Sequence, residues 1–184
     1  LGIGAGVDEV ATMHSMGAVR TTGNDFDLAL EGKGFFAVET PRGIRYTRNG
    51  TFVKNSRNEL VTQDGYRVLG ENGPITIEGR KMVVDSGGNV VVDDQPIGTL
   101  QIVEFANEKQ LAKEGSSLYI AAPGQTGTKG TSSVHQGTLE MSNVNVISEM
   151  VNLISNYRAY EINSKTVQSN DHLLDKAVNE VGKI

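Results

Sequence analysis

Few of the side chains that could do chemistry lie close enough along the chain to suggest a shared site. The three histidines, His14, His135 and His172, are far apart and have no spacing that would let two of them bind one metal ion. Within the C-terminal helix that the sequence predicts, His172 is flanked by Asp171 and Asp175, which could form a cation site. A solvated or interface histidine is the simpler interpretation, so we expect no metal centre.

Two further pairs of polar residues have equally simple structural interpretations. Asp93-Asp94 could hold a cation at a strand corner, but a β-turn with exposed carboxylates explains the pair as well. Ser116-Ser117 has no histidine or lysine placed near it by any sequence rule, and the chain contains neither a GxSxG elbow nor a Walker loop. We therefore expect no catalytic residue, no cofactor and no enzymatic activity.

The spaced glycines of residues 1–7 (LGIGAGV) resemble part of a nucleotide-binding loop. That fingerprint needs a preceding strand and a following helix, and the sequence indicates neither. We interpret the segment as a turn that leads into a strand around Val7 to His14.

The composition excludes several classes of protein. The net charge is −5 and no cluster of Lys and Arg occurs, which argues against a nucleic-acid partner. No apolar run approaches the roughly 18 residues of a membrane span, so we expect no membrane insertion. The chain lacks Cys, and disulfides and thiolate metal sites are therefore excluded.

Residues 21–140 show short apolar runs separated by turn residues, which is typical of an all-β domain. Around Leu28 the alternation of apolar and polar residues predicts a strand with one buried face. We expect turns between strands at four places: residues 41–43 (PRG), 49–50 (NG), 64–65 (DG) and 86–88 (SGG). Asn49-Gly50 is the strongest of these signals, because both positions tolerate a positive φ.

Three other segments of this region have a predicted structure. Residues 98–105 should form one longer strand, and residues 107–114 a short helical turn, because Ala, Lys, Gln, Leu and Glu favour helix. Residues 121–133 (AAPGQTGTKGTSS) should form a surface loop. Residues 134–141 would then return the chain to a helix.

The stretch from Ser142 to Ile184 predicts a single long helix. It has no proline and no glycine before Gly182, and alternating steps of three and four residues from Val146 meet mostly apolar side chains, as in a coiled-coil seam. Asn145 is a good N-cap. Glu149 near the start, with Lys176 and Lys183 near the end, would complement the helix dipole. A helix of this length spans about 60 Å and needs a partner helix to cover its stripe.

The apolar and aromatic positions of this seam are our predicted assembly interface. They are Val146, Met150, Leu153, Tyr157, Tyr160, Val167, Leu174, Val178 and Val181. Ser164 and Asp171 interrupt the seam, and such polar positions can fix register and partner number. Tyr157 and Tyr160 suit interface anchors. Core packing against another helix is an equally good interpretation of the two tyrosines.

Several motifs in one order carry a resemblance to a known family. They are residues 28–36 (LALEGKGFF), 46–52 (YTRNGTF), 60–62 (LVT) with Gly65-Tyr66, 142–145 (SNVN), 149–151 (EMV) and 158–165 (RAYEINSK). This series closely resembles the bacterial flagellar axial proteins, the rod and hook family. The short central region is similar to that of a proximal or distal rod subunit rather than of the larger hook subunit. Members open with an amphipathic helix that pairs with the C-terminal one, so we interpret this chain, which begins without it and without Met, as truncated.

The resemblance implies a structural subunit of the flagellar basal-body rod, which polymerises through terminal helices into the shaft that transmits torque from motor to hook. Implied partners are other copies, other rod and hook proteins and, at the β domain, the bushing rings. The implied location is the basal body in the cell envelope, which is the periplasm of a two-membrane cell. The expected fold is mainly β: an entry segment at 1–20, an irregular β domain at 21–140, and a coiled-coil-type helix at 141–184.

Two other classes of function stay open. A secreted β-domain adhesin or glycan-binding module with a helical oligomerisation tail would explain the strands. It has no need of so long a helix, and would usually present Trp or Tyr on an exposed platform. A hydrolase would need a convergent set of polar residues that the sequence does not indicate.

Overall fold

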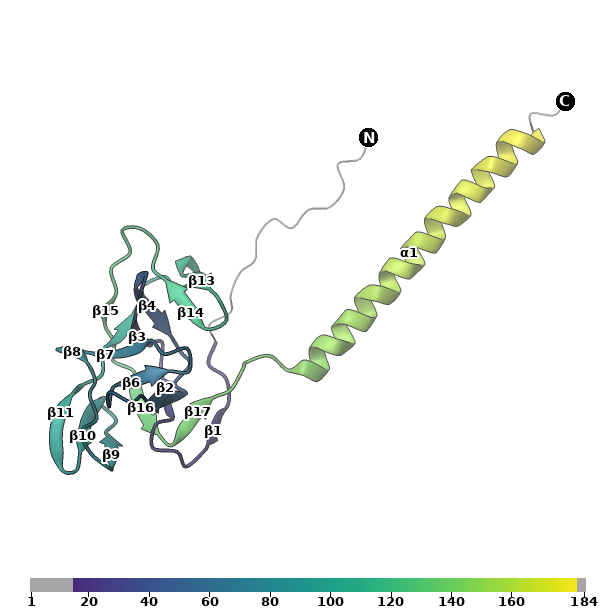
Figure 1. Ribbon diagram of the computed structural model, residues 1–184. Helices are drawn as coiled ribbons and strands as arrows, with labels where there is room; N and C mark the ends of the chain where they lie inside the picture. Colours follow the sequence, from purple (N-terminus) through teal and green to yellow (C-terminus); the bar gives the residue numbers. More distant parts are fainter. Residues whose placement is uncertain (1–14, 182–184) are drawn as a thin grey trace. The chain divides into compact units, whose positions relative to one another are not determined.

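The computed structural model describes the backbone of residues 15–181 and the side chains of residues 15–179. It comprises a β unit and one long helix, α1 (Val146–Val181), and the chain divides into two compact units after Asn143 (Figure 1). The predicted fold class, mainly β with a single long C-terminal helix, is confirmed. The strand expected around Val7 to His14 lies outside the described residues, as does most of the expected entry segment 1–20.

The largest sheet of the β unit is antiparallel. Its main path, in spatial order, is β13 (Ala112–Glu114), β14 (Leu118–Ile120), β4 (Gly43–Thr47), β3 (Phe35–Thr40), β7 (Arg67–Gly70), β6 (Leu60–Thr62) and β5 (Phe52–Lys54). Three strands pair beside this path: β12 (Ile102–Glu104), β15 (Thr128–Lys129) and β8 (Gly73–Pro74). The strand β3 is central, because β4 pairs along one of its edges while β12 and β7 share the other.

Three smaller antiparallel sheets complete the unit (Figure 1). They consist of β9 (Met82–Val84), β10 (Asn89–Val92) and β11 (Gln95–Thr99); of β2 (Leu28–Glu31) and β16 (Ser133–Gln136); and of β1 (Val19–Thr21) and β17 (Thr138–Glu140). In the last pair, the strand that enters the β unit lies beside the strand that leaves it.

The core follows from the burial of β3 on both faces. Phe36 and Val38 belong to the larger apolar cluster, whereas Phe35 and Ala37 belong to a smaller one. Phe36 packs edge-on against Phe52, with ring centroids 5.1 Å apart. A strand buried on both faces needs a continuous apolar run, which is what residues 35–38 provide.

Three of the four predicted turns between strands are confirmed. The turns at residues 41–43, 64–65 and 86–88 connect β3 to β4, β6 to β7 and β9 to β10. Each contains a glycine with positive φ, namely Gly43, Gly65 and Gly88. The β-turn interpretation of Asp93-Asp94 is also confirmed, because both residues have a positive φ and connect β10 to β11.

The hairpin predicted at Asn49-Gly50 is wrong. After this dipeptide the chain does not turn back on β4, because β5 pairs with β6 and β4 pairs with β3 and β14. Neither Asn49 nor Gly50 has a positive φ. The dipeptide instead runs beside the start of β2, where the N–H of Leu28 donates to the carbonyl of Gly50 at 3.0 Å.

Four other predictions need correction. The strand at 28–31 is buried on both faces, because Ala29 is as buried as Leu28. The long strand expected at 98–105 is two strands, since residues 100 and 101 bridge to the segment around β7 and separate β11 from β12.

The helical turn expected at 107–114 is only the 3-10 turn Glu108–Gln110, because buried Leu111 then leads into β13. The loop at 121–133 lies mostly at the surface but contains β15 and the buried Ser132.

Candidate assembly interface

The N-terminus of α1 is capped by the residue that the sequence indicates. The Oδ1 of Asn145 accepts the backbone N–H groups of Ile147 and Ser148 at 3.1 and 3.2 Å. Glu149 lies in the first turn, where its charge complements the helix dipole. Such a cap contributes about 0.5–2 kcal/mol to helix stability. The helix therefore begins at Val146, directly after the predicted cap Asn145, and residues 142–145 of the predicted stretch are not helical.

The other end of the helix matches the sequence less closely. Within the described residues α1 ends at Val181 and its last turn has no basic side chain, because Lys176 lies earlier. Lys183 lies outside the described residues. The expected complement of the dipole at this end is therefore not provided by Lys176.

The predicted seam residues whose side chains are described all lie on α1 and are exposed within this chain. Their exposed fractions run from 59% for Val167 to 72% for Tyr160 and Val178. The side chain of Val181 is not among the described ones. Burying one such side chain is worth about 1.5–3 kcal/mol, so this exposure leaves much free energy of burial to be gained from a partner.

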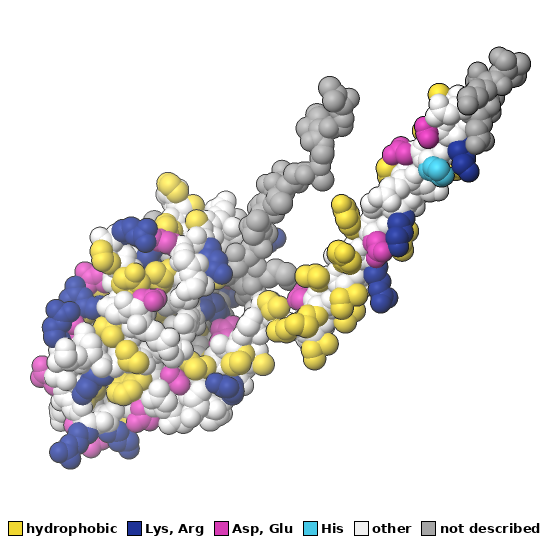
Figure 2. Space-filling view, turned by 45° about the vertical axis from the view of Figure 1, so that its right-hand side comes forward, with side chains coloured by type: hydrophobic (Ala, Val, Ile, Leu, Met, Phe, Trp, Pro, Cys, Tyr) yellow, Lys and Arg dark blue, Asp and Glu magenta, His cyan; other side chains and the backbone are white. Residues whose placement is uncertain are grey.

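Apolar exposure on the first half of α1 extends beyond the seam. Ile147, Val151, Ile154 and Ile162 are also exposed, with fractions from 51% to 75%. Figure 2 shows hydrophobic side chains gathered on the visible face of this half, whereas the second half carries more polar and charged groups. The apolar surface of the first half is thus wider than the narrow stripe of a two-helix coiled coil.

Most of the other side chains of the helix are polar or charged. Glu161 and Lys165 form an exposed i, i+4 ion pair with an Nζ to Oε1 distance of 2.7 Å. Such a pair contributes only about 0.3–0.5 kcal/mol. It marks an outer surface of the helix and supplies no site for chemistry.

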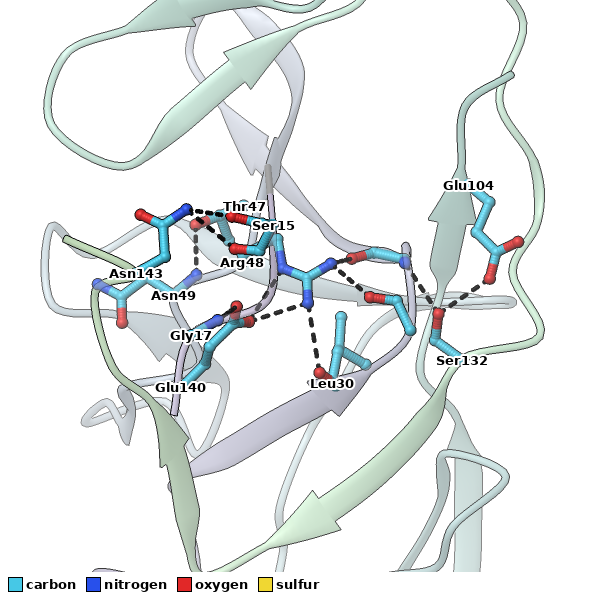
Figure 3. A network of polar contacts seen from close by, with 12 residues as sticks. Ser15, Gly17, Leu30, Thr47, Arg48, Asn49, Glu104, Ser132, Glu140 and Asn143 are labelled. Atoms are coloured by element: carbon cyan, nitrogen blue, oxygen red, sulfur yellow. Dashed lines mark hydrogen bonds and ion pairs between the residues drawn. The ribbon is translucent and has the colours of Figure 1, made fainter. Parts of the chain in front are cut away.

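The two strands that enter and leave the β unit are joined to it by a polar network centred on Arg48 (Figure 3). The guanidinium of Arg48 lies against the carboxylate of Glu140 on β17, with an Nη2 to Oε2 distance of 2.9 Å. The other carboxylate oxygen of Glu140 accepts the N–H of Gly17 at 3.0 Å. Both side chains are largely buried, with exposed fractions of 13% and 12%. The ion pair therefore includes a residue of β17 and also contacts Gly17, which lies two residues before β1.

Neither member of this ion pair was predicted as a site residue. Arg48 belongs to the YTRNG motif, which carried the resemblance but no assigned role. Glu140 is 92 residues away in the sequence, so no local pattern could pair them. The one available signal is the position of Arg48 directly after β4.

The remaining candidate groups are separated in space or already paired. Nε2 of His135 lies 2.7 Å from Oε2 of Glu31 at the exposed surface. His172 lies on α1, and His14 is outside the described residues. The carbonyl of Ser117 accepts the hydroxyl of Thr47 at 2.8 Å. Among the described residues, no three His, Asp or Glu side chains gather as a metal site would require.

One hollow of the β unit has a volume of about 380 Å3. Its wall includes residues 99–103 and 127–132, and two of its charged residues, Lys129 and Glu71, pair with each other at 2.6 Å. Ser132 on this wall already donates its hydroxyl to Glu104 at 2.9 Å. In the part of the chain that the structure describes, no helix has the length and apolar content of a membrane span.

Comparison with known proteins finds two matching family profiles. The profile described as the D1 domain of the flagellar hook protein FlgE/F/G matches residues 29–115. The profile described as the C-terminal part of the flagellar basal-body rod FlgEFG proteins matches residues 135–180. The matches include most of the large sheet and nearly all of α1.

Individual relatives agree with the two profiles. The basal-body rod protein FlgG of Bacillus subtilis is 36% identical over 97% of this chain and 74% of the relative. FlgG of Buchnera aphidicola from Acyrthosiphon pisum is 38% identical over 96% of the chain and 74% of the relative. The rod protein FlgF of Caulobacter vibrioides is 38% identical over 95% and 73%.

A β unit, a long helix with an exposed apolar surface and these matches together define a structural subunit of the flagellar axial type. The chain belongs to the family of flagellar basal-body rod proteins. The relatives described above carry rod-protein names, so the adhesin alternative gains no support from them.

Proposed function

We propose that this chain is a structural subunit of the flagellar basal-body rod that polymerises through α1 into the shaft that transmits torque from motor to hook. The observation that carries the proposal is the exposure of the seam from Val146 to Val178 in a single chain. A soluble protein rarely leaves so large an apolar surface uncovered. Family membership then indicates that other flagellar axial subunits are the partners that cover it.

The width of the apolar surface on the first half of α1 supports a polymer rather than a dimer. A two-helix seam would leave Ile147, Val151 and Ile154 in water, because these side chains lie beside the seam and not on it. A helix inside a tube has neighbours on more than one side, and these extra apolar side chains suit the additional contacts. We infer that the first half of α1 packs against more than one neighbouring helix.

The β unit would then form the outer part of the subunit. Part of its exposed charge is paired within the unit, as in the ion pair of Arg67 with Glu39 at 2.7 Å. We propose that it contacts neighbouring subunits, hook proteins or the bushing rings, in the basal body and within the cell envelope. In this account the protein performs no catalysis and needs no cofactor.

Deletion of the helix tests the function directly. In a strain that lacks the gene, the full-length protein should restore motility and be present in isolated basal bodies. A variant without residues 146–181 should accumulate with a folded β unit but be absent from basal bodies. Its presence there in normal amount would overturn the proposal.

A further inference from the structure

We propose that the Arg48–Glu140 pair is a joint that fixes the strand leading into α1 to the β unit, and so positions the helix for assembly. The covalent path from the helix to the β unit runs through residues 141–145 into β17, which ends at Glu140. Along this path the side-chain amide of Asn143 first donates to the carbonyl and hydroxyl oxygens of Ser15 at 3.0 and 2.8 Å, and the chain then joins β17. The assembly half of this proposal rests on the proposed function, whereas the joint itself does not.

The β1–β17 ribbon has little apolar burial to hold it in place. All three residues of β1 are exposed, and the three residues of β17 are only half-buried. Its three residue pairs join the two strands to each other. Backbone pairing within a ribbon does not attach the ribbon to a core, so its attachment depends on other contacts.

Arg48 supplies contacts of that kind with every N–H group of its guanidinium (Figure 3). Nε donates to Glu140 at 3.0 Å, and Nη2 also contacts this carboxylate at 2.9 Å. The remaining donors reach three backbone carbonyls around the turn between β2 and β3, at 2.8–3.3 Å: those of Leu30, Gly32 and Gly34. Only an arginine has five donors in a rigid planar fork, so a lysine cannot make this set of contacts.

The network continues from the turn into the core sheet. The N–H of Gly34 donates to the Oγ of Ser132 at 2.8 Å, and that hydroxyl donates to Glu104 on β12 at 2.9 Å. The Cζ of Arg48 also lies 5.8 Å from the ring centre of Phe35, which belongs to the buried strand β3. The Arg48 side chain therefore connects the exposed ribbon to the buried part of β3.

On the entering strand, the contact with Glu140 requires a glycine at position 17. A Cβ at this position would overlap with the carbonyl of Met141, so the two strands approach closely just beyond their paired residues. The N–H of Met141 donates to the carbonyl of Ala18 at 2.8 Å. Glu140 on β17 thus also holds the entering strand, at the place where the two strands approach closely.

A second buried ion pair in the same unit provides a matched control. Arg45 and Glu114 pair with exposed fractions of 12% and 16%, close to those of Arg48 and Glu140. They connect β4 with β13, and neither lies on β1 or β17. Removing Arg45 should perturb the β unit without affecting the ribbon, and to a smaller degree than removing Arg48, because Glu114 keeps Arg42 as a partner at 2.6 Å.

The test is amide hydrogen exchange by NMR on the purified chain, with Arg48→Met, Arg48→Lys and Glu140→Gln compared with Arg45→Met. In the three joint variants the amides of Gly17 and Met141 should exchange about tenfold faster or more, because each variant removes or weakens the charge-assisted contacts of Arg48 with Glu140 that hold the ribbon. The amide of Leu60, which donates to Ile75 far from the joint, should change no more than in Arg45→Met. Unchanged exchange at Gly17 and Met141 would overturn the proposal.

A double variant separates the joint from a mere penalty for an unpaired charge. Arg48→Met combined with Glu140→Leu removes both charges, so the thermal stability of the β unit should largely return. The ribbon amides should still exchange fast, since no side chain then connects β17 to the turn. Recovery of slow exchange in the double variant would contradict the joint.

Motility tests the assembly half in cells that lack the gene. Arg48→Lys and Glu140→Gln should swim less than cells with Arg45→Met. Normal swimming of both, despite fast exchange of the ribbon amides, would overturn the positioning role. If instead removal of α1 leaves the protein in basal bodies, the proposed function fails while the exchange result on the joint stands.

Discussion

Gly50 lies against Leu28 so closely that a Cβ on Gly50 would overlap with the carbonyl oxygen of Leu28. The N–H of the same leucine donates to the carbonyl of Gly50 at 3.0 Å. Glycine is therefore required here by the close approach of two backbones, not by a positive φ. Leu28 is fully buried, so neither segment has room to move away.

Gly50→Ala should destabilise the β unit by about 1–3 kcal/mol or more, as other overpacking substitutions do. The control is Gly87→Ala, because a Cβ at that position would meet its nearest neighbours only at 3.4 Å and beyond. Chemical denaturation of both variants measures the difference. Equal stability of the two variants would show that the backbone at Gly50 can move away from Leu28, contrary to this account.

The same contact explains where prediction from the sequence fails. The turns at residues 64–65 and 86–88 were predictable because each connects strands that follow one another and pair locally. The turn signal of Asn49-Gly50 is stronger than these two, yet its glycine allows a close contact with β2, which ends 19 residues earlier. A local pattern carries no information about that contact.

The candidate sites divide in the same way. The helix, its cap at Asn145 and its exposed apolar positions follow from spacing within one segment, and α1 begins where the cap predicts. The Arg48–Glu140 pair joins residues that are brought together only by the fold of the whole β unit. The role of the seam in assembly stays a prediction, since a single chain does not show what covers it.

The side chain of Gln136 takes the place of a strand at the open edge of β9. Its Oε1 accepts the N–H of Val84 at 3.0 Å, and its Nε2 donates to the carbonyl of Met82 at 2.8 Å. Gln136→Leu should leave both backbone groups without these partners and cost about 1–3 kcal/mol. Gln95→Leu on exposed β11 should stay within about 0.5 kcal/mol of the unchanged protein by thermal melting. If the two variants melt alike, the amide of Gln136 is not needed by β9.

Acid should destabilise the β unit. The backbone N–H groups of Arg80 and Lys81 hold the pKa of Asp93 below its usual 3.8, and the side-chain amide of Asn89 acts likewise on the pKa of Asp85. Burial alone would raise the pKa of Glu104, but hydrogen bonds from Thr131 and Ser132 outweigh it, and the net pKa lies below 4.5.

A carboxyl group whose pKa is lower in the folded state stabilises the fold at any pH above its unfolded-state pKa. This stabilisation is lost as the pH falls through the folded-state pKa. The contribution of these carboxyl groups to the free energy of unfolding should therefore be constant at pH values above the usual pKa range of Asp and Glu. It should decrease as the pH falls below that range. Denaturation at a series of pH values, repeated with Asp93→Asn, measures the effect. The variant should lose stability at neutral pH but approach the unchanged protein in acid. An equal deficit at every pH would mean that the Asp93 charge is not responsible.

A charge on the seam should abolish assembly without harming the β unit. Leu174 is exposed in the single chain, so Leu174→Asp should leave the melting of the β unit unchanged. In the rod, the same change would lose about 1.5–3 kcal/mol of burial in every subunit and add the cost of a buried carboxylate. Glu161→Ala should retain motility, because it removes only an exposed pair. Normal swimming with Leu174→Asp would show that this part of the seam is not an interface.

The central claim is that the seam of α1 is covered by other helices in the assembled rod, and cysteine labelling measures this most directly. The chain has no native Cys, so a single introduced thiol is the only target in it for a maleimide. Leu174 and Lys176 are two residues apart and therefore point about 200° apart around the helix. Both Leu174→Cys and Lys176→Cys should react fast in the isolated chain.

In purified basal bodies the two positions should differ. The account predicts that Leu174→Cys reacts many times more slowly there than in the isolated chain, and that Lys176→Cys is slowed much less. Equally fast reaction of Leu174→Cys in both states would contradict the assignment of α1 to the shaft.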